Sequence, residues 1–304
     1  MPYALLGGAQ LAVGAAAIFA RYALGGAQPI AVSAARLAIA ALVLFAIAAF
    51  RLRAANAGPV TRRQNFILAL AGVALAAHFA GWIWSLEYTT VATSTLLVAS
   101  TPVWTALYDA AFGKNRLSRA AMAAFATGAA GLVMVVGFNH ARPPFPGHEL
   151  LGALLALGGS VAIAAYLLLV REVRARTNTR AIVTRTYGWA ALVLVASAAL
   201  AHQPPPPVSD TAAWGGIIAM ALISQLLGHT AINASLRWFS PSAVSFASLL
   251  EPVFAAMLAL ALFHESVAAP ALAGAVLLLG SIAVVLREEH KALDGSGLYI
   301  GPVQ

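Results

Sequence analysis

Two histidines and one glutamate stand inside long apolar runs, where few other residues can do chemistry. His78 and His229 lie about 150 residues apart, and histidine titrates near neutral pH and can relay protons. The same residues also fit neutral rings that bond a helix carbonyl, and both interpretations stay open. A metal site would need a third ligand at suitable spacing, and the sequence offers none, so no metal ion is predicted.

Glu251 lies midway along an apolar run, directly before Pro252. A charge at the centre of a bilayer costs roughly 2.5–3.5 kcal/mol on insertion scales, so this acid needs an explanation. One interpretation is a proton acceptor or a contact for a substrate amine. The other is a hinge, in which Pro252 frees a backbone carbonyl and a protonated Glu251 bonds nearby backbone. Further coupling or bending points are predicted at Pro102, Gly8 and Gly158.

Aromatic and polar side chains recur in the same runs at helical spacing. His78 and Trp82 share one helix face, and Trp104 and Tyr108 share another. A pocket of rings and hydroxyls suits a zwitterion with an apolar side chain or a flat organic cation, although such rings also form belts at membrane surfaces. The residues predicted to bind substrate are His78, Trp82, Thr101, Trp104, Tyr108, Tyr166, Gln225, His229 and Phe246.

Four charged residues mark the ends of apolar runs or interrupt them. Arg36 is predicted either to bind a substrate carboxylate or to anchor the outer membrane face. Arg185, at a near-matching point about 150 residues later, is expected to reach the inner face. Glu87 and Glu265 stand at the outer ends of apolar runs and are expected to be solvated.

The composition places these residues in a lipid-embedded chain. Of the 304 residues, 61% are hydrophobic and 9% are charged, against roughly 25% charged residues in soluble domains. The net charge of +8 does not indicate nucleic acid, because the arginines lie in short loops and form no basic face. The chain has no cysteine, which excludes disulfides, thiol catalysis and cysteine metal sites. No cofactor is predicted.

The apolar runs predict an all-α integral membrane protein with ten transmembrane helices, since each run approaches the ~20 residues that cross a bilayer. Most of the 18 basic residues fall in loops on one side, so both termini are expected in the cytoplasm. The expected location is the inner (plasma) membrane, and the expected assembly is a monomer. The spans are predicted at residues 3–23, 30–50, 66–86, 92–112, 121–139, 149–170, 181–201, 212–233, 241–263 and 269–287.

An internal repeat divides the chain into two halves. Residues 86–116 align with residues 236–266 without a gap, so that Pro102 falls on Pro252. Each half, 1–139 and 149–287, has five predicted spans, and 288–304 is predicted to be a cytoplasmic tail. An odd number of spans makes the second half enter the membrane from the opposite face. The halves are therefore predicted to form an inverted-topology pair, as in many secondary transporters.

Three motifs resemble the drug/metabolite transporter superfamily, in its ten-helix branch with two EamA-type repeats. They are Arg36 within AVSAARLAIAALVL, the TPV with its following FGKN, and LEPVFAAMLALALFHES. Within the superfamily, the chain is similar to YddG-like exporters of amino acids and viologens. The resemblance implies a basket of ten helices, a central cavity and export by alternating access. Where the family motif often has Gly-Glu, this chain has Gly113-Lys114-Asn115.

The predicted function is secondary export of small amphiphilic metabolites, with neutral or aromatic amino acids favoured. Drug-like organic cations such as viologens are the alternative substrates. Sugar phosphates are disfavoured because both lysines stand at helix ends, and small-multidrug antiport because the first span has no carboxylate. A membrane enzyme would need a nucleophile with a base, or paired carboxylates, and no such pattern occurs. A channel stays open as another class.

Overall fold

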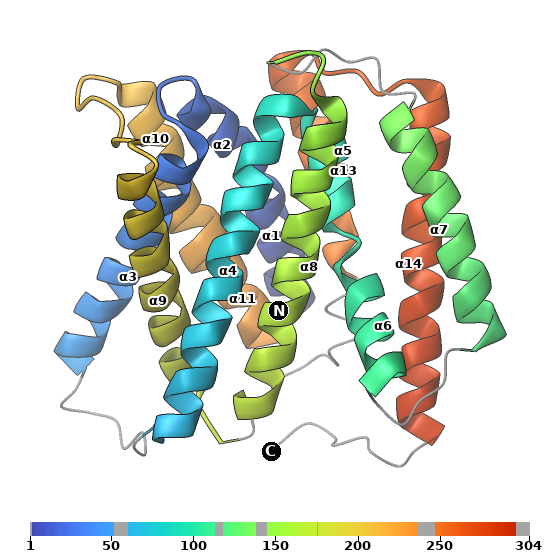
Figure 1. Cartoon of the computed structure of the whole chain (residues 1–304), viewed down its shortest axis with the longest axis horizontal. Coiled ribbons are helices and arrows are strands. Elements are labelled where there is room, and N and C mark those ends of the chain that lie inside the picture. Colours follow the sequence, from blue (N-terminus) through green and yellow to red (C-terminus); the bar gives the residue numbers. More distant parts are fainter. Residues whose placement is uncertain are drawn as a thin grey trace.

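The computed structural model describes residues 2–51, 60–112, 118–137, 145–174, 176–235 and 247–295, and within them every regular element is a helix. The helices run up and down between two ends of the molecule (Figure 1). They are α1 (Pro2–Gly14), α2 (Ala16–Leu24), α3 (Pro29–Arg51), α4 (Arg62–Tyr88), α5 (Val91–Val98), α6 (Thr101–Phe112), α7 (Arg119–Gly137), α8 (Glu149–Arg174), α9 (Thr179–Leu200), α10 (Thr211–Ala219), η1 (Met220–His229), α11 (Thr230–Ser235), α13 (Leu250–Phe263) and α14 (Ala269–Gly295).

Six stretches of the described chain are long and apolar enough to cross a membrane. Shorter apolar helices add residues 122–135, 250–263 and 269–284. Large apolar side chains such as Leu42, Phe112 and Leu200 are mostly exposed on the outside of the bundle, as expected where lipid rather than water surrounds it. The all-helical membrane fold is confirmed, and the count of ten spans stays a prediction.

Two spans that were predicted as single helices are interrupted. The first breaks at Ala15, between α1 and α2. The fourth breaks between α5 and α6, where Pro102 takes the second position of α6 and donates no backbone hydrogen bond. The hydroxyls of Ser100 and Thr101 bond the carbonyls of Leu97 and Val98 at the break, at 2.6 and 2.7 Å. These bonds give the carbonyls near the interruption a side-chain donor.

The eighth span changes its hydrogen-bond register instead of breaking. It runs as α10, then η1, then α11, and η1 is a π-helix of 10 residues. A π-helix bonds each residue to the fifth one along, and such segments are frequent at functional sites. Gln225 and His229 both lie in η1, so two residues predicted to bind substrate stand on its widened turns.

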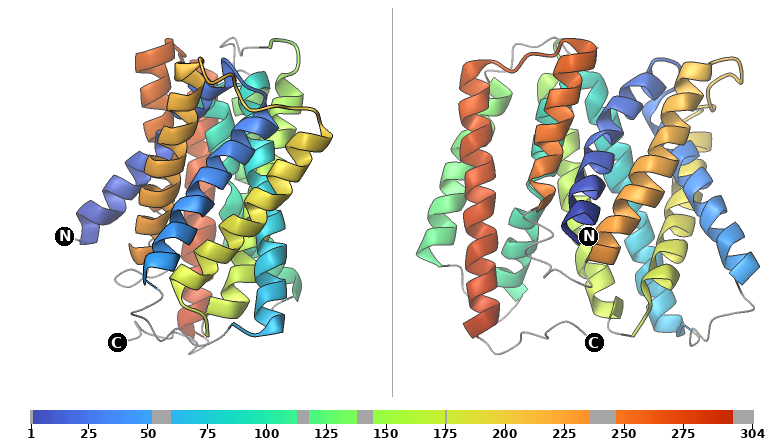
Figure 2. Two further views of the ribbon diagram at one scale, coloured as in Figure 1. Left: turned by 90° about the vertical axis from the view of Figure 1, so that its left-hand side faces the viewer. Right: turned by 180° about the vertical axis from the view of Figure 1, so that it is seen from behind.

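Helices from the two halves of the chain pack against each other throughout. The closest pairs are α4 with α8, α3 with α9, and α7 with α14. The last pair lies side by side at one edge of the bundle in both figures (Figures 1 and 2). The first and sixth spans also cross the opposite half, α1 on η1 and α8 on α4. The polar groups described below are therefore held between the halves.

The crossing of α7 and α14 depends on two glycines. A Cβ atom on Gly131 would lie 2.6 Å from the carbonyl oxygen of Gly274, and one on Gly274 would lie 2.6 Å from that of Gly131. We expect Gly131→Ala to lower the stability by about 1–3 kcal/mol, because the backbones must separate. Thermal unfolding in detergent measures this. Gly280→Ala, also on α14 but with open space around it, is the control, and an equal loss in both variants would contradict the packing argument.

Candidate functional site

A buried arginine lies at the centre of the candidate site. Arg36 of α3 is 0% exposed. Its guanidinium carbon lies 4.1 Å from the ring centre of Phe79 and 5.6 Å from that of Trp82, both on α4. Its Nη2 donates to the side-chain oxygen of Gln225 in η1, at 2.7 Å. The name arginine cluster is used below for Arg36, Phe79, Trp82 and Gln225 together with His78.

Two of the three guanidinium nitrogens of Arg36 have no acceptor. Nε and Nη1 are both buried without a hydrogen-bond partner. Arg36 takes part in neither the Arg21–Glu265 nor the Arg63–Glu172 ion pair. A buried charge without a charged partner is costly. The alternative that Arg36 anchors the outer membrane face is therefore wrong for this conformation.

His78 joins two helices beneath the cluster. Its Nδ1 lies 2.9 Å from the carbonyl oxygen of Gly159 on α8, and because a carbonyl only accepts, Nδ1 carries the hydrogen. The His78 ring is parallel to Trp82, with centroids 6.4 Å apart. His229 approaches Phe79 edge-on, with 6.3 Å between ring centroids. Both predicted histidines thus lie against Phe79, and His229 adjoins the arginine cluster, to which His78 belongs.

A second polar group surrounds the break in the fourth span. The hydroxyl of Ser160 on α8 accepts from the indole nitrogen of Trp104 at 3.1 Å. It also lies 3.1 Å from the hydroxyl of Ser100 and 3.2 Å from that of Thr101. These bonds attach α5 and α6 to α8. Ser160 was not among the residues predicted from the sequence.

The remaining predicted residues have varied surroundings. Tyr166 is buried at 9% exposure, whereas Tyr108 is 42% exposed and its ring lies 5.0 Å from that of Phe112. Tyr108 and Trp104 thus belong to one helix but not to one buried site. Phe246 lies outside the described residues.

The predicted bending points are likewise divided. Gly8 and Gly158 lie within continuous helices, both exposed and with open space where a Cβ would stand. Pro252 is buried in the first turn of α13, and the carbonyl oxygen of Glu251 lies beside Gly14 of α1. A bending role at these positions stays a prediction.

Another residue missed from the sequence is Gln10. It is 0% exposed, and both polar atoms of its side chain lack a partner. Gln10 and Ser160 stand about 150 residues apart, so they occupy matching points of the repeat in α1 and α8. The signal that could have found them was the repeat offset applied to polar residues in apolar runs, not only to histidines and glycines.

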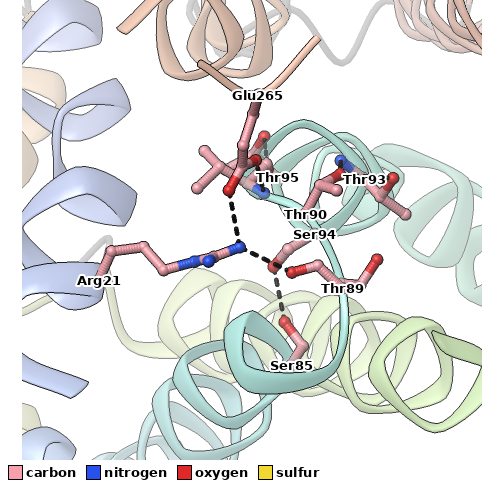
Figure 3. A network of polar contacts seen from close by, with 9 residues as sticks. Arg21, Ser85, Thr89, Thr90, Thr93, Ser94, Thr95 and Glu265 are labelled. Atoms are coloured by element: carbon pink, nitrogen blue, oxygen red, sulfur yellow. Dashed lines mark hydrogen bonds and ion pairs between the residues drawn. The ribbon is translucent and has the colours of Figure 1, made fainter. Parts of the chain in front are cut away.

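An ion pair joins α2 to the connection between α13 and α14 (Figure 3). Arg21 of α2 binds Glu265, in the turn between α13 and α14, at 3.0 Å, with side chains 12% and 10% exposed. Arg21 also donates to the carbonyl oxygen of Thr89 at 2.9 Å. Glu265 accepts from the backbone nitrogen of Val91, at 2.9 Å, where α5 begins. The expectation that Glu265 is solvated is wrong, because the long Arg21 side chain reaches it across the bundle.

Small hydroxyl residues lie near this ion pair and bond to one another (Figure 3). Ser85 of α4 and Ser94 of α5 lie 2.6 Å apart through their hydroxyls. Thr90 caps α5 by accepting from the backbone nitrogen of Thr93, at 3.2 Å. The network therefore connects α2, the start of α5 and the turn before α14 at one end of the molecule.

The helical bundle and its polar interior agree with one family model. The model of the EamA-like transporter family matches residues 2–137 and 150–287. The chain belongs to the EamA-like transporter family. It is thus a multi-pass membrane protein of a family of small-molecule transporters and not of enzymes, which confirms the broader part of the family resemblance.

A solved structure shares the fold of this EamA-like transporter. It is titled only "Crystal structure of protein", and it is 19% identical with a TM-score of 0.65, covering 95% of this chain and 97% of that chain. Identity at this level shows the fold alone. The curated proteins contain no match to the chain.

Proposed function

We propose that this EamA-like transporter is a secondary exporter of small amphiphilic metabolites, with neutral and aromatic amino acids as the first substrates to test. The observation that carries the proposal is the arginine cluster. Arg36 and Phe79 come from the first half of the chain and Gln225 from the second. A polar and aromatic group between two halves of an apolar bundle is where secondary transporters bind their substrates.

Alternating access is the mechanism that we propose for these halves. An inverted repeat supports it, since one half can exchange its conformation with the other. The crossing of α1 on η1 corresponds to the crossing of α8 on α4, as a two-fold relation between the halves requires. The YddG-like exporters of amino acids and viologens are the branch that this proposal favours.

The proposed orientation of the chain in the membrane rests on the positive charges. The described helix ends on one side of the bundle carry most of its arginines (Figure 1). Because cytoplasmic loops are enriched in arginine and lysine, we place this side and both termini in the cytoplasm, with the chain in the inner (plasma) membrane. The Arg21–Glu265 pair then closes the outer end. The arginines concerned are Arg51, Arg62, Arg63, Arg119, Arg171, Arg174, Arg176 and Arg180.

Counterflow in liposomes tests the function. We expect saturable uptake of labelled phenylalanine that unlabelled phenylalanine on the other side accelerates. His229→Ala and Trp104→Ala should each lower the rate about tenfold or more, because they remove a ring beside Phe79 and the bond to Ser160. The control is Trp189→Ala on α9, a residue 37% exposed outside the clusters.

Three outcomes would change the proposal. Transport without acceleration from the opposite side would indicate a channel. Transport of viologen-like cations in place of any amino acid would indicate the drug-export alternative. Movement of neither class would refute the proposed substrates.

A further inference from the structure

We propose that Arg36 is the docking point for a carboxylate of the transported molecule, so that substrates must carry this group. The inference rests on the proposed function and names the substrate chemistry of the same site. It starts from the charge of Arg36. Neither the Arg21–Glu265 nor the Arg63–Glu172 ion pair involves Arg36, and the arginine cluster contains no acid.

The protein satisfies the guanidinium only in part. Gln225 supplies one neutral acceptor, and the face of Phe79 supplies a cation–π contact. Arginine has five N–H donors and no acceptor. The hydrogens on Nε and Nη1 are therefore buried without a protein acceptor, and bulk solvent does not contact Arg36, which is 0% exposed.

A carboxylate supplies what is missing. It brings a negative charge and several acceptor sites in a planar group, which suits the guanidinium better than any neutral ligand. The rings of Phe79 and Trp82 flank the same guanidinium, so an apolar or aromatic remainder of the substrate meets apolar surface. A doubly charged phosphate fits less well, because the described cluster offers a single arginine.

The same geometry disfavours organic cations. A viologen-like molecule would add positive charge beside a cation that already lacks a negative partner, and like charges in a low-dielectric interior repel strongly. In this conformation Arg36 is also 0% exposed. The substrate must therefore reach Arg36 in a conformation in which α3, α4 and η1 separate at one end.

Three molecules that share a phenyl ring but differ in their charged groups test whether a carboxylate is required for binding. Binding to the purified full chain in detergent is measured by calorimetry with phenylalanine, 3-phenylpropionate and phenylethylamine. We expect the two carboxylates to bind and phenylethylamine to bind at least about tenfold more weakly, since one charge-assisted bond is worth about that factor or more. Equal or tighter binding of phenylethylamine, or binding of none of the three, would overturn the proposal.

A substitution inside the cluster distinguishes docking from a structural role. Gln225→Glu places a carboxylate where an oxygen already lies 2.7 Å from Arg36 Nη2. This carboxylate would neutralise the guanidinium charge that the substrate carboxylate would otherwise bind. We expect carboxylate binding to fall about tenfold or more while the thermal unfolding midpoint is kept or raised. Unchanged binding in a stable Gln225→Glu protein would mean that Arg36 only holds η1, and would overturn the proposal.

Removal of the arginine completes the test. Arg36→Gln should abolish carboxylate binding, and Arg185→Gln should not, because Arg185 lies at the near-matching point of the repeat but is partly exposed and bonds Asn65. Counterflow is run beside binding with the same molecules. Transport of phenylethylamine at the rate of phenylalanine would overturn the carboxylate requirement and leave the transporter proposal intact. Carboxylate binding without any transport would refute the export function alone.

Discussion

Replacing Glu265 with alanine is expected to open the outer end of the bundle. The substitution removes the ion pair to Arg21 and the bond from the backbone of Val91, at 3.0 and 2.9 Å. These are the contacts that join α2, α5 and the turn before α14. Loss of one partner also leaves Arg21 with an unbalanced charge at 12% side-chain exposure, which favours states in which water reaches it.

A single cysteine reports this opening, because the chain has none of its own. Val91→Cys is suitable, since Val91 is 0% exposed and takes part in the network only through its backbone. We expect a membrane-impermeant thiol reagent to label it about tenfold faster once Glu265 is alanine, as coupling energies of 1–3 kcal/mol imply.

Two further variants give this experiment its controls. Glu149→Gln removes an acid at the start of α8, on the same end but partly exposed and bonded only to nearby Gly147 among the contacts described, so labelling should not change. The exchanged pair, Arg21→Glu with Glu265→Arg, should slow labelling again. Equal labelling of the Glu265→Ala and unsubstituted proteins would mean that the ion pair does not hold this end closed.

Replacing Glu251 with glutamine is expected to uncouple transport from a proton gradient. Glu251 is the acid that stands midway along a predicted span, in the first turn of α13 and next to buried Pro252. Its backbone oxygen lies beside Gly14 of α1, at a contact between the two halves. An acid at such a contact can bind a proton in one state and release it in the other.

The uncoupled state has a specific signature in liposomes. Accumulation driven by a pH difference should disappear in Glu251→Gln, while counterflow at equal pH should continue, because glutamine keeps the shape but binds no proton. Glu172→Gln is the control, since its side chain is 52% exposed and its contact with Arg63 is 3.9 Å long. Loss of both activities would instead support a hinge at Glu251 and Pro252, and retention of both would exclude either role.

The helices could be predicted from the sequence because lipid-facing and buried residues are both apolar, so the runs are conspicuous. The family likewise followed from motifs that are local in the chain. The breaks at Ala15 and between α5 and α6 were not predicted, because apolar composition does not change there. Pro102 marked the second break, but a proline alone does not tell a kink from an interruption.

The contacts of the site required the fold. Gln225 meets Arg36 across 189 positions of the chain, and no periodicity within a helix relates residues so distant. Arg36 was considered for carboxylate binding from its type alone, with a membrane anchor as the equal alternative. Only the burial of its guanidinium and the missing acceptors separate these interpretations. The Arg21–Glu265 pair was missed for the same reason, since each residue alone looks like an end-of-helix charge.

In the π-helical stretch η1, the winding of the eighth span differs from that of an α-helix and can change locally. In an α-helix each residue is rotated by a fixed angle about the axis from the one before it. A wider turn changes this angle, so all residues after it point in other directions than they would in a continuous α-helix. If one π turn tightened to an α turn, Gln225 would swing around the helix axis away from Arg36 without any sliding of the whole span. A local change of winding in Met220–His229 can thus break a contact at the centre of the bundle by turning one part of the helix relative to the other.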